Sequence, residues 1–208
     1  RTVPQRRTGL SLHAQGGRVR SLWDGRRASS TVMGMPSPLI PPPTARLQFR
    51  RYVEADEQFV IDLFNDRYAK RFYPSMASIE AARGWIDWNL RNYESHGYGL
   101  WVVEDVETGR ALGDCGLTVQ DVGGAPMVEV GYHILDAERG QGYATEAAGA
   151  CVAYGLDDLG LSVVCSIVDP QNEASIRVAE HIHTVRSSFE DQRGETMILF
   201  RTRDGDRR

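Results

Sequence analysis

A glycine-rich turn at residues 140–142, Gly-Gln-Gly, stands between an apolar run and an apolar helical pattern. The run, at residues 127–135, has the length of a buried strand. Small or apolar residues then recur at helical spacing from Ala144 to Gly155. Glycine lets the backbone approach a ligand closely, and the first turn of a helix leaves main-chain N–H groups without internal acceptors. This order of strand, turn and helix predicts an anion site that suits a pyrophosphate.

The turn differs from two common nucleotide-binding loops. The dinucleotide fingerprint G-x-G-x-x-G fails at its third glycine, where the chain has Thr145. A P-loop needs Gly-Lys-Ser/Thr, and the only lysine in the chain is Lys70. The pattern Arg139-x-x-Gly142-x-Ala144 instead resembles the coenzyme A loop, Q/R-x-x-G-x-G/A, of the GNAT (Gcn5-related) N-acetyltransferase superfamily.

Two further blocks extend this resemblance. Residues 129–132 read Glu-Val-Gly-Tyr, and residues 169–175 read Asp-Pro-Gln-Asn-Glu-Ala-Ser. Together with residues 140–147, and in this order, they resemble the ribosomal-protein N-terminal (alanine) acetyltransferase branch. The resemblance covers about residues 46–203. It implies the GNAT fold, an α/β fold with a central mixed, mostly antiparallel twisted sheet, helices on both faces, and a splay between the fourth and fifth strands.

The periodicity of the chain predicts the same kind of layered α/β fold. Asp56, Ser78 and Asn172 are the expected helix N-caps, because their short side chains accept hydrogen bonds from the first helical N–H groups. The expected elements, in order, are a strand from Leu47 to about Tyr52, helices after Asp56 and after Ser78, strands at 98–104, 112–119 and 127–135, a helix that Gly160 ends, a strand at 161–168, a helix from Asn172 to about Ile182, and strands at 184–189 and 196–201.

The domain organisation follows from composition. Residues 1–45 are basic and proline-rich without periodicity, so we expect a disordered extension. Residues 46–203 form the expected acetyltransferase domain, and residues 204–208 a C-terminal tail. Met33 and Met35, just before the proline-rich link, are candidate starts of the natural product.

Charge and composition narrow the class of partner. The formal net charge is −4, and the extension has a balance of +6, which leaves −10 for the rest. An acidic body favours a cationic amine over a nucleic acid. No apolar run reaches the length of a membrane helix, so we expect a cytoplasmic protein without a membrane partner. Cys115, Cys151 and Cys165 lack metal-site spacing and are interpreted as buried thiols, so no metal is expected.

Acetyl transfer from a thioester to an amine has three chemical needs. The carbonyl oxygen needs hydrogen-bond donors, the ammonium needs a proton acceptor, and the leaving thiolate can take a proton from an acid. The resemblance implies acetyl-CoA as co-substrate, with the strand's main chain near the thioester and the turn's amides on the pyrophosphate. The residues it assigns to the cofactor are Tyr132, His133, Ile134, Arg139, Gly140, Gln141, Gly142, Tyr143, Ala144 and Asn172.

Two residues are the catalytic candidates. Glu129 shares one face of its strand with Gly131 and His133, because side chains alternate, and a carboxylate is unexpected in so apolar a strand. The resemblance places a glutamate here near the acceptor amine, which it would bind or deprotonate through water; a solvated sheet face is the alternative. Ser175 is the candidate acid for the thiolate; the alternative is an ordinary residue in the first turn of its helix.

The acceptor is expected to be a primary amine, either a protein N-terminal α-amine or a small amine. In the family the helical region before residue 98 lines the acceptor cleft, so Trp88 is a candidate substrate-binding residue. Asp114 is a further carboxylate candidate on the acceptor side. His133 is either a helper in proton transfer or a structural histidine. The expected assembly is a monomer or a homodimer.

One segment departs from the branch. After the last helix the branch usually has a Lys-x-Gly-Phe-like segment, but residues 181–184 read His-Ile-His-Thr. The glycine that would end the helix in a left-handed turn is missing, so we expect a different helix exit. This departure supports a rival interpretation, a non-catalytic acyl-CoA-binding sensor or pseudoenzyme. A nucleic-acid-binding protein that uses its arginine-rich arm is the other rival, and it predicts steeply salt-dependent binding.

Overall fold

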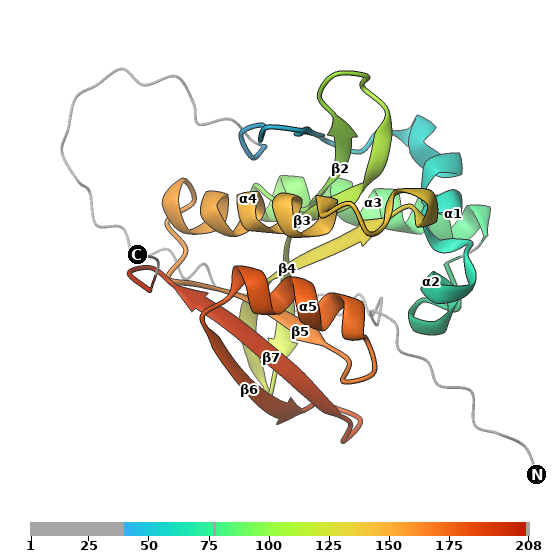
Figure 1. Ribbon diagram of the computed structural model, residues 1–208. Helices are drawn as coiled ribbons and strands as arrows, with labels where there is room; N and C mark the ends of the chain where they lie inside the picture. Colours follow the sequence, from blue (N-terminus) through green and yellow to red (C-terminus); the bar gives the residue numbers. More distant parts are fainter. Residues whose placement is uncertain (1–39, 77, 207–208) are drawn as a thin grey trace, which may run out of the picture.

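The structure, a computed structural model, describes residues 40–76 and 78–206. Its strands are β1 (Leu47–Arg50), β2 (Leu100–Asp105), β3 (Ala111–Val122), β4 (Ala125–Ile134), β5 (Val163–Val168), β6 (Val185–Glu190) and β7 (Thr196–Arg203). They form one open seven-stranded sheet in the order β1-β2-β3-β4-β5-β7-β6 (Figure 1). Neighbouring strands are antiparallel except for β4 and β5, which are parallel.

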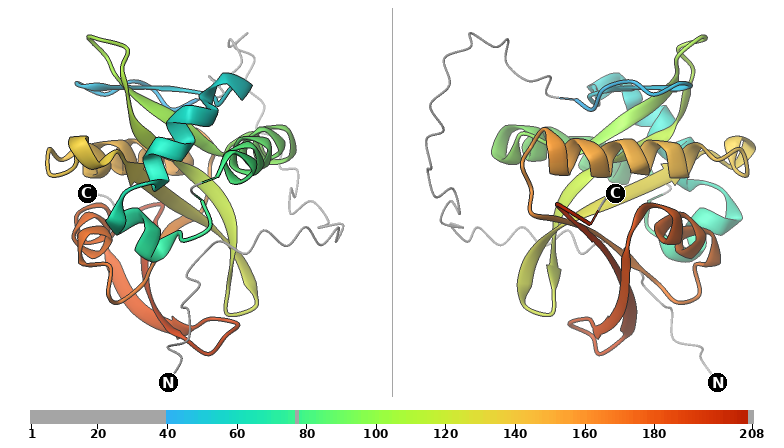
Figure 2. Two further views of the ribbon diagram at one scale, coloured as in Figure 1. Left: turned by 90° about the vertical axis from the view of Figure 1, so that its right-hand side faces the viewer. Right: turned by 60° about the vertical axis from the view of Figure 1, so that its left-hand side comes forward.

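Helices cover both faces of this sheet. They are α1 (Glu57–Phe64), α2 (Arg67–Phe72), α3 (Ile79–His96), α4 (Tyr143–Asp157) and α5 (Glu173–Ile182), with short 3-10 turns η1 (Glu54–Asp56) and η2 (Asp136–Glu138). α1 and α3 pack on one face, and α4 and α5 lie on the other (Figures 1 and 2). The mixed, mostly antiparallel α/β fold expected from the sequence is therefore confirmed.

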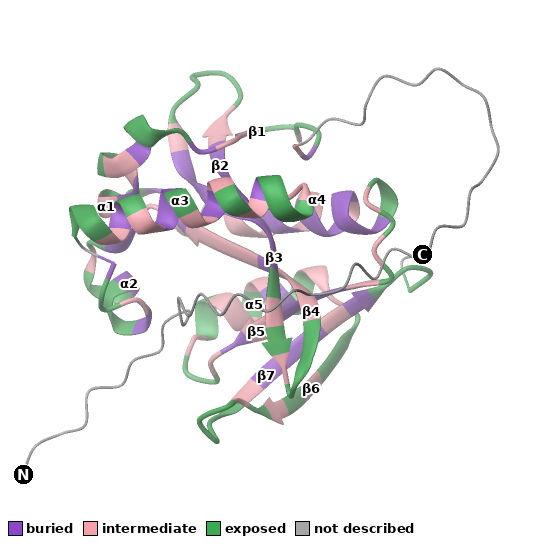
Figure 3. Ribbon diagram, turned by 180° about the vertical axis from the view of Figure 1, so that it is seen from behind, coloured by how far each residue is buried: buried purple, intermediate pink, exposed green. Residues whose placement is uncertain are grey.

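Alternation of side chains along β2 explains why the domain has two main apolar cores. Leu100 and Val102 pack with α1 and α3, whereas Trp101 and Val103 pack with α4, and all four are buried. Figure 3 shows buried residues along the central strands and exposed ones towards the tip of the β3–β4 hairpin. With both faces covered, the central strands hold their side chains in fixed positions.

β4 and β5 are joined at a single point. Their register contains one residue pair, Glu129 with Cys165, whereas β3 and β4 pair continuously from Gly113–Ile134 to Val122–Ala125. Beyond Glu129 the two strands separate. This is the splay that the sequence resemblance implied between the fourth and fifth strands.

The helix starts differ in part from the sequence-based expectation. The side chains of Ser78 and Asn172 cap α3 and α5, as predicted. Asp56 stands before α1, but its carboxylate accepts no capping hydrogen bond there, because it pairs with Arg50 at 2.8 Å. The sequence analysis also missed α2, a six-residue helix capped by Asp66. Fewer than two turns are too short to produce a periodic pattern.

The chain segment before β1 is already part of the domain. Thr44 Oγ1 donates to Glu146 Oε1 at 2.6 Å, and Ile40 packs against the core cluster under α4. Residues 40 and 44 of the expected extension therefore contact the domain, while residues 1–39 lie outside the described residues. Within the part of the chain that the structure describes, no helix is both long and apolar enough to cross a membrane.

The exit from α5 is extended rather than left-handed. His183 has φ −122° and ψ 155°, so the missing glycine causes no backbone strain. Its ring is fixed on both nitrogens, with Nε2 3.0 Å from Ser166 Oγ and Nδ1 3.0 Å from Thr202 Oγ1. Burial lowers the pKa of His183 from 6.5 to about 4. The departure that the sequence flagged is thus a neutral histidine that ties α5 to β5 and β7.

This histidine makes stability depend on pH. Because its pKa is lower in the folded state, the stabilisation is complete above about pH 6.5 and is lost as the pH falls towards 4. We expect the wild type to lose roughly 1–2 kcal/mol more unfolding free energy than His183→Gln between pH 7.5 and 5. Urea unfolding of both proteins at the two pH values measures this difference. Parallel losses in the two proteins contradict the assignment.

Candidate functional site

A cluster of unpartnered main-chain amides lies at the start of α4. Gly140 and Gly142 have φ of +79° and +83°, a left-handed conformation that favours glycine. No side chain caps the helix at Gly142. Among the residues that the structure describes, none offers a hydrogen-bond acceptor to the N–H groups of residues 142–145. Free main-chain donors therefore lie at the helix N-terminus where the sequence predicts an anion site.

A cavity of about 300 Å³ opens beside these amides. Its wall includes residues 142–145 of the turn and helix, residues 132–134 of β4, and Asn172 and Ser175 of α5. α1 and α2 close it with apolar and aromatic side chains, among them Phe64. Of the ten residues predicted to bind the cofactor, the cavity wall holds all but Gln141. The structure thus brings together two blocks that lie thirty residues apart in sequence.

The splayed part of β4 turns main-chain groups towards this cavity. Ser166 Oγ of β5 donates to the carbonyl of Val130 at 3.3 Å, so that carbonyl faces the β5 side. Main-chain groups alternate along a strand, which directs those of Tyr132 and Ile134 to the same side and those of His133 towards β3. Beyond Glu129 no strand pairs with this edge. The edge therefore offers donors of the kind that a developing oxyanion needs.

The Arg139 side chain braces the loop. Its Nε donates to the Ile134 carbonyl at 3.0 Å, and its Nη1 and Nη2 donate to Asp66 at 3.0 and 2.7 Å. Asp136 accepts a further bond from Nη1 at 2.9 Å. Most of the Arg139 N–H donors thus bond within the protein. These bonds hold the start of α2 against the anion loop, residues 139–144.

Arg46 and Glu146 brace the other side of the loop. Arg46 Nε and Nη2 lie 2.7 and 2.6 Å from Glu146 Oε2, and Nη1 donates to the Gln141 carbonyl at 3.1 Å. Glu146 stands in the first turn of α4, where an unpaired carboxylate would repel a bound anion. The ion pair neutralises this charge and fixes the turn.

α2 also reaches across to α5. Tyr68 Oη donates to Asn172 Oδ1 at 2.5 Å, and Arg71 Nη2 donates to Gln171 Oε1 at 2.7 Å. Asn172 Oδ1 accepts the N–H of Ser175 as well. Tyr68 and Asn172 both line the cavity, so this contact bridges two of its walls.

Glu129 is half-buried and lies where β4 and β5 part, outside the cavity wall. Its Oε1 accepts the Ile167 N–H at 3.0 Å, a group left without a strand partner by the splay. Burial, opposed by this bond, raises the pKa of Glu129 from 4.5 to about 7. Glu129 therefore does not lie on a fully solvated sheet face, which was the alternative.

Ser175 lies on the cavity wall in the first turn of α5. Its N–H donates to Asn172, and its carbonyl accepts from Tyr132 Oη at 2.9 Å. Burial raises the pKa of Tyr132, which keeps this phenol protonated. Its N–H and carbonyl are both used, which leaves the hydroxyl as the remaining polar group of Ser175.

Of the two predicted substrate-binding residues, neither lies on the cavity wall. Trp88 packs on Trp85, with ring centroids 5.4 Å apart, as part of the core under α3. Asp114 is fully buried behind His133, which does line the cavity. His133 Nδ1 and Asp114 Oδ1 are 2.6 Å apart.

Sequence reasoning missed several residues that shape this site, chiefly Asp66, Tyr68 and Tyr73. Asp66 caps α2, Tyr68 lies within it and Tyr73 follows it, and this part of the sequence carries no motif. The three cysteines are free and buried, in agreement with their interpretation as buried thiols. Within the described ranges, no three His, Cys, Asp or Glu side chains gather as a metal site requires.

Unpaired amides, a splayed strand and a cavity between them form the main cleft of the described α/β domain. The Acetyltransferase (GNAT) domain family matches residues 46–185 of this sequence. The chain therefore belongs to the GNAT acetyltransferase family. It is an acyltransferase of the N-acetyltransferase class with acetyl-CoA as its co-substrate.

Relatives with the same domain are known from bacteria. The uncharacterised protein YkkB of Bacillus subtilis is 37% identical over 140 residues, which cover 67% of this chain and 81% of the relative. The uncharacterised N-acetyltransferase YoaA of the same species is 29% identical over 137 residues, 65% of this chain and 77% of that protein.

Solved structures show the same fold. An acetyltransferase from Agrobacterium tumefaciens aligns with a TM-score of 0.68 and 24% identity, over 86% of this chain and 99% of that one. RimL, a ribosomal L7/L12 α-N-protein acetyltransferase in complex with coenzyme A, aligns with a TM-score of 0.63 and 15% identity, over 80% and 99%.

The residues present fit acetyl-CoA. Free amides at residues 142–145 suit the pyrophosphate, and the cavity continues from them along β4. Ala at position 142 would resist the left-handed φ at a cost of about 1–2 kcal/mol. We therefore expect Gly142→Ala to weaken acetyl-CoA binding about tenfold.

Gly149→Ala is the matched control, because a methyl group there meets open space inside α4. We expect it to leave affinity unchanged and to stabilise the helix by up to about 1 kcal/mol. Calorimetric titration with acetyl-CoA measures both variants. Equal affinities for the two variants contradict the assignment of the loop.

Proposed function

We propose that this enzyme transfers the acetyl group from acetyl-CoA directly to a primary amine, and that the acceptor is a protein N-terminal α-amine or a small amine. The single observation that carries this proposal is the cavity that begins at the free amides of α4 and continues along the unpaired edge of β4 to His133. The catalytic domain is residues 46–203, together with the segment from Ile40 that packs on it.

The cofactor roles follow from the positions of the main-chain groups. The amides of residues 140–144 hold the pyrophosphate, and Asn172 contacts the cofactor arm from α5. Main-chain donors at Tyr132 and Ile134 stabilise the thioester carbonyl oxygen as negative charge grows on it. Arg139 supports the loop from behind rather than through a phosphate contact, since Asp66 and Asp136 already use its donors.

Ser175 is the proposed acid that protonates the departing thiolate. It lies on the cavity wall, and its hydroxyl is its remaining polar group. Glu129 is the proposed partner of the acceptor ammonium. A cation close to this carboxyl would offset the effect of burial and favour its ionised form.

An α-amine suits the site better than a polyamine does. SpeG of Vibrio cholerae, a spermidine N-acetyltransferase, shares this fold with a TM-score of 0.59. A polyamine carries several charges, and in the described chain the cavity wall has one carboxylate, Glu138, which pairs with Arg110. An α-amine has a pKa of about 7.7–8.0 and loses its proton at small cost near neutral pH. The three-block sequence resemblance also favours this acceptor.

Release of coenzyme A in the presence of an acceptor panel tests the proposed function. The panel contains N-terminal peptides, small primary amines and spermidine. We expect turnover with N-terminal peptides or small amines, and little with spermidine. Tight acetyl-CoA binding without turnover on any acceptor supports the sensor instead and overturns the proposal.

Glu129→Gln and Ser175→Ala separate the two catalytic roles. The glutamine keeps the bond from Ile167 but carries no charge, so we expect the acceptor KM to rise about tenfold at pH 8. In the wild type, KM for the acceptor should rise as the pH falls below about 7, where Glu129 gains its proton. Ser175→Ala should instead lower kcat, by about 10- to 100-fold, with little change in acetyl-CoA affinity.

Steady-state kinetics from pH 6 to 9 measure both effects. Ser162→Ala, at an exposed position before β5, is the control for Ser175. An acceptor KM with the same pH dependence in wild type and Glu129→Gln removes Glu129 from acceptor binding. An unchanged kcat in Ser175→Ala removes Ser175 from the mechanism.

A further inference from the structure

A buried carboxylate and a histidine form a pair between the sheet and the cavity. Asp114 of β3 and His133 of β4 are direct partners in the strand register, and Nδ1 of the ring lies 2.6 Å from Asp114 Oδ1. The Asp114 side chain is 0% exposed and the His133 side chain 12% exposed. Since His133 lines the cavity, the pair runs from the protein interior to the cavity surface.

Asp114 is held firmly from its other side. Its Oδ2 accepts bonds from Tyr52 Oη at 2.7 Å and from Trp85 Nε1 at 3.1 Å. Three donors around one carboxylate fix its orientation. Packing alone does not explain a buried carboxylate here, because an apolar residue would fill the same space without the free-energy cost of burying a charge.

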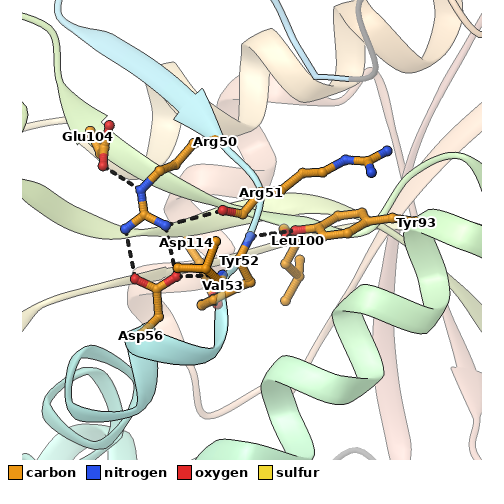
Figure 4. Close-up of polar contacts among 9 residues, drawn as sticks. All are labelled: Arg50, Arg51, Tyr52, Val53, Asp56, Tyr93, Leu100, Glu104 and Asp114. Atoms are coloured by element: carbon orange, nitrogen blue, oxygen red, sulfur yellow. Dashed lines mark hydrogen bonds and ion pairs between the residues drawn. The ribbon is translucent and has the colours of Figure 1, made fainter.

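The segment that carries Tyr52 is itself fixed in place (Figure 4). Arg50 bridges Glu104 and Asp56, at 2.6 and 2.8 Å, and so pins the chain on either side of Tyr52. The N–H of Tyr52 donates to Tyr93 Oη at 3.3 Å, and Tyr93 Oη in turn donates to the Leu100 carbonyl. The support behind Asp114 therefore extends over β1, β2 and α3.

Aromatic rings enclose the histidine. The centroids of Phe64, Tyr73 and Trp85 lie 5.0, 4.9 and 5.6 Å from the His133 ring, all edge-on. These three rings pack around the imidazole of His133, whose Nδ1 points to Asp114. A carboxylate on Nδ1 selects the tautomer in which that nitrogen carries the proton. Nε2 is then the acceptor, and within the described chain no protein group bonds to it.

We propose that His133 Nε2 accepts the proton of the acceptor ammonium and that Asp114 is its positioning residue. This inference rests on the proposed function and names the proton acceptor for that same reaction. The N–H bond of the ammonium breaks and Nε2 gains the proton. The freed amine forms a C–N bond to the thioester carbon, and as the C–S bond breaks the thiolate takes a proton from Ser175 or water. The nitrogen of the new amide gives up its second proton, which restores that donor. The imidazolium then returns its proton to solvent.

Glu129 and His133 play different parts in this scheme. They stand four residues apart on the same face of β4. Tyr73 packs against the His133 ring, and the charges of Glu129 and Asp114 both act on its phenol. Burial and these two charges raise the pKa of Tyr73, so it stays a neutral phenol. The titratable groups in contact with His133 are therefore Asp114 and Tyr73, because Phe64 and Trp85 carry no charge. Glu129 bonds to the Ile167 N–H of β5 instead. Glu129 attracts the cation and His133 removes its proton.

His133→Gln tests the proposal in the full chain. The variant keeps a polar side chain but has no basic nitrogen, so we expect kcat to fall by about 10²–10⁴-fold while acetyl-CoA affinity stays within about twofold. The acidic limb of the kcat–pH profile should disappear or move. His96→Gln, at an exposed end of α3 remote from the cavity wall, is the matched control and should behave as wild type.

A second pair of variants separates chemistry from folding. His133→Ala leaves space among the aromatic rings, and we expect added imidazole to restore at least tenfold of its lost kcat, which a purely structural role would not allow. Asp114→Asn removes the charge behind Nδ1 and should lower kcat with an unchanged acceptor KM.

The outcomes also distinguish this inference from the proposed function. If the wild type turns over an amine but His133→Gln retains its kcat and pH profile, the histidine is structural and the inference fails. Loss of activity without imidazole rescue, together with a lowered melting temperature, also overturns it. If the wild type transfers no acetyl group to any amine, the proposed function itself has failed.

Discussion

The structure depends on a sheet that is paired at only one residue between two of its central strands. Glu129 and Cys165 join β4 to β5, and beyond them the edges part. Buried main-chain groups need partners, so such a gap is costly unless side chains or a ligand supply them. Here the Glu129 carboxylate takes the Ile167 N–H, and Ser166 Oγ donates to the Val130 carbonyl. These two side chains hold the gap open, and the cavity follows from it.

The turn at residues 140–142 and the His133 ring, which line the cavity, are each held by a charged side chain. Arg139 and Arg46 secure the anion loop from two sides through Asp66 and Glu146. Asp114 secures the ring of His133 in the same way. In each case a charged side chain is used up within the protein so that a neighbouring group has a fixed direction. Among the described residues, the main-chain amides of residues 142–145 and the Nε2 of His133 are the groups beside the cavity without a protein partner.

The parts of the site that sequence reasoning found are those with local signals. The turn at residues 140–142 and the cap at Asn172 each depend on a few adjacent residues, and the structure has both. The brace between Asp66 and Arg139 and the bond between Tyr52 and Asp114 join residues 73 and 62 positions apart, and no periodicity encodes such pairs. Trp88 and Trp85 share one helix, and only packing decides which of them approaches the site.

The raised pKa of Glu129, about 7, has a thermodynamic consequence. At neutral pH roughly half of the molecules carry a proton on this carboxyl, by the definition of a pKa. Under the proposed role of Glu129, the acceptor ammonium displaces that proton into the medium. Capture of the amine and release of a hydrogen ion are then one linked equilibrium, so the heat of association varies with the ionisation enthalpy of the buffer.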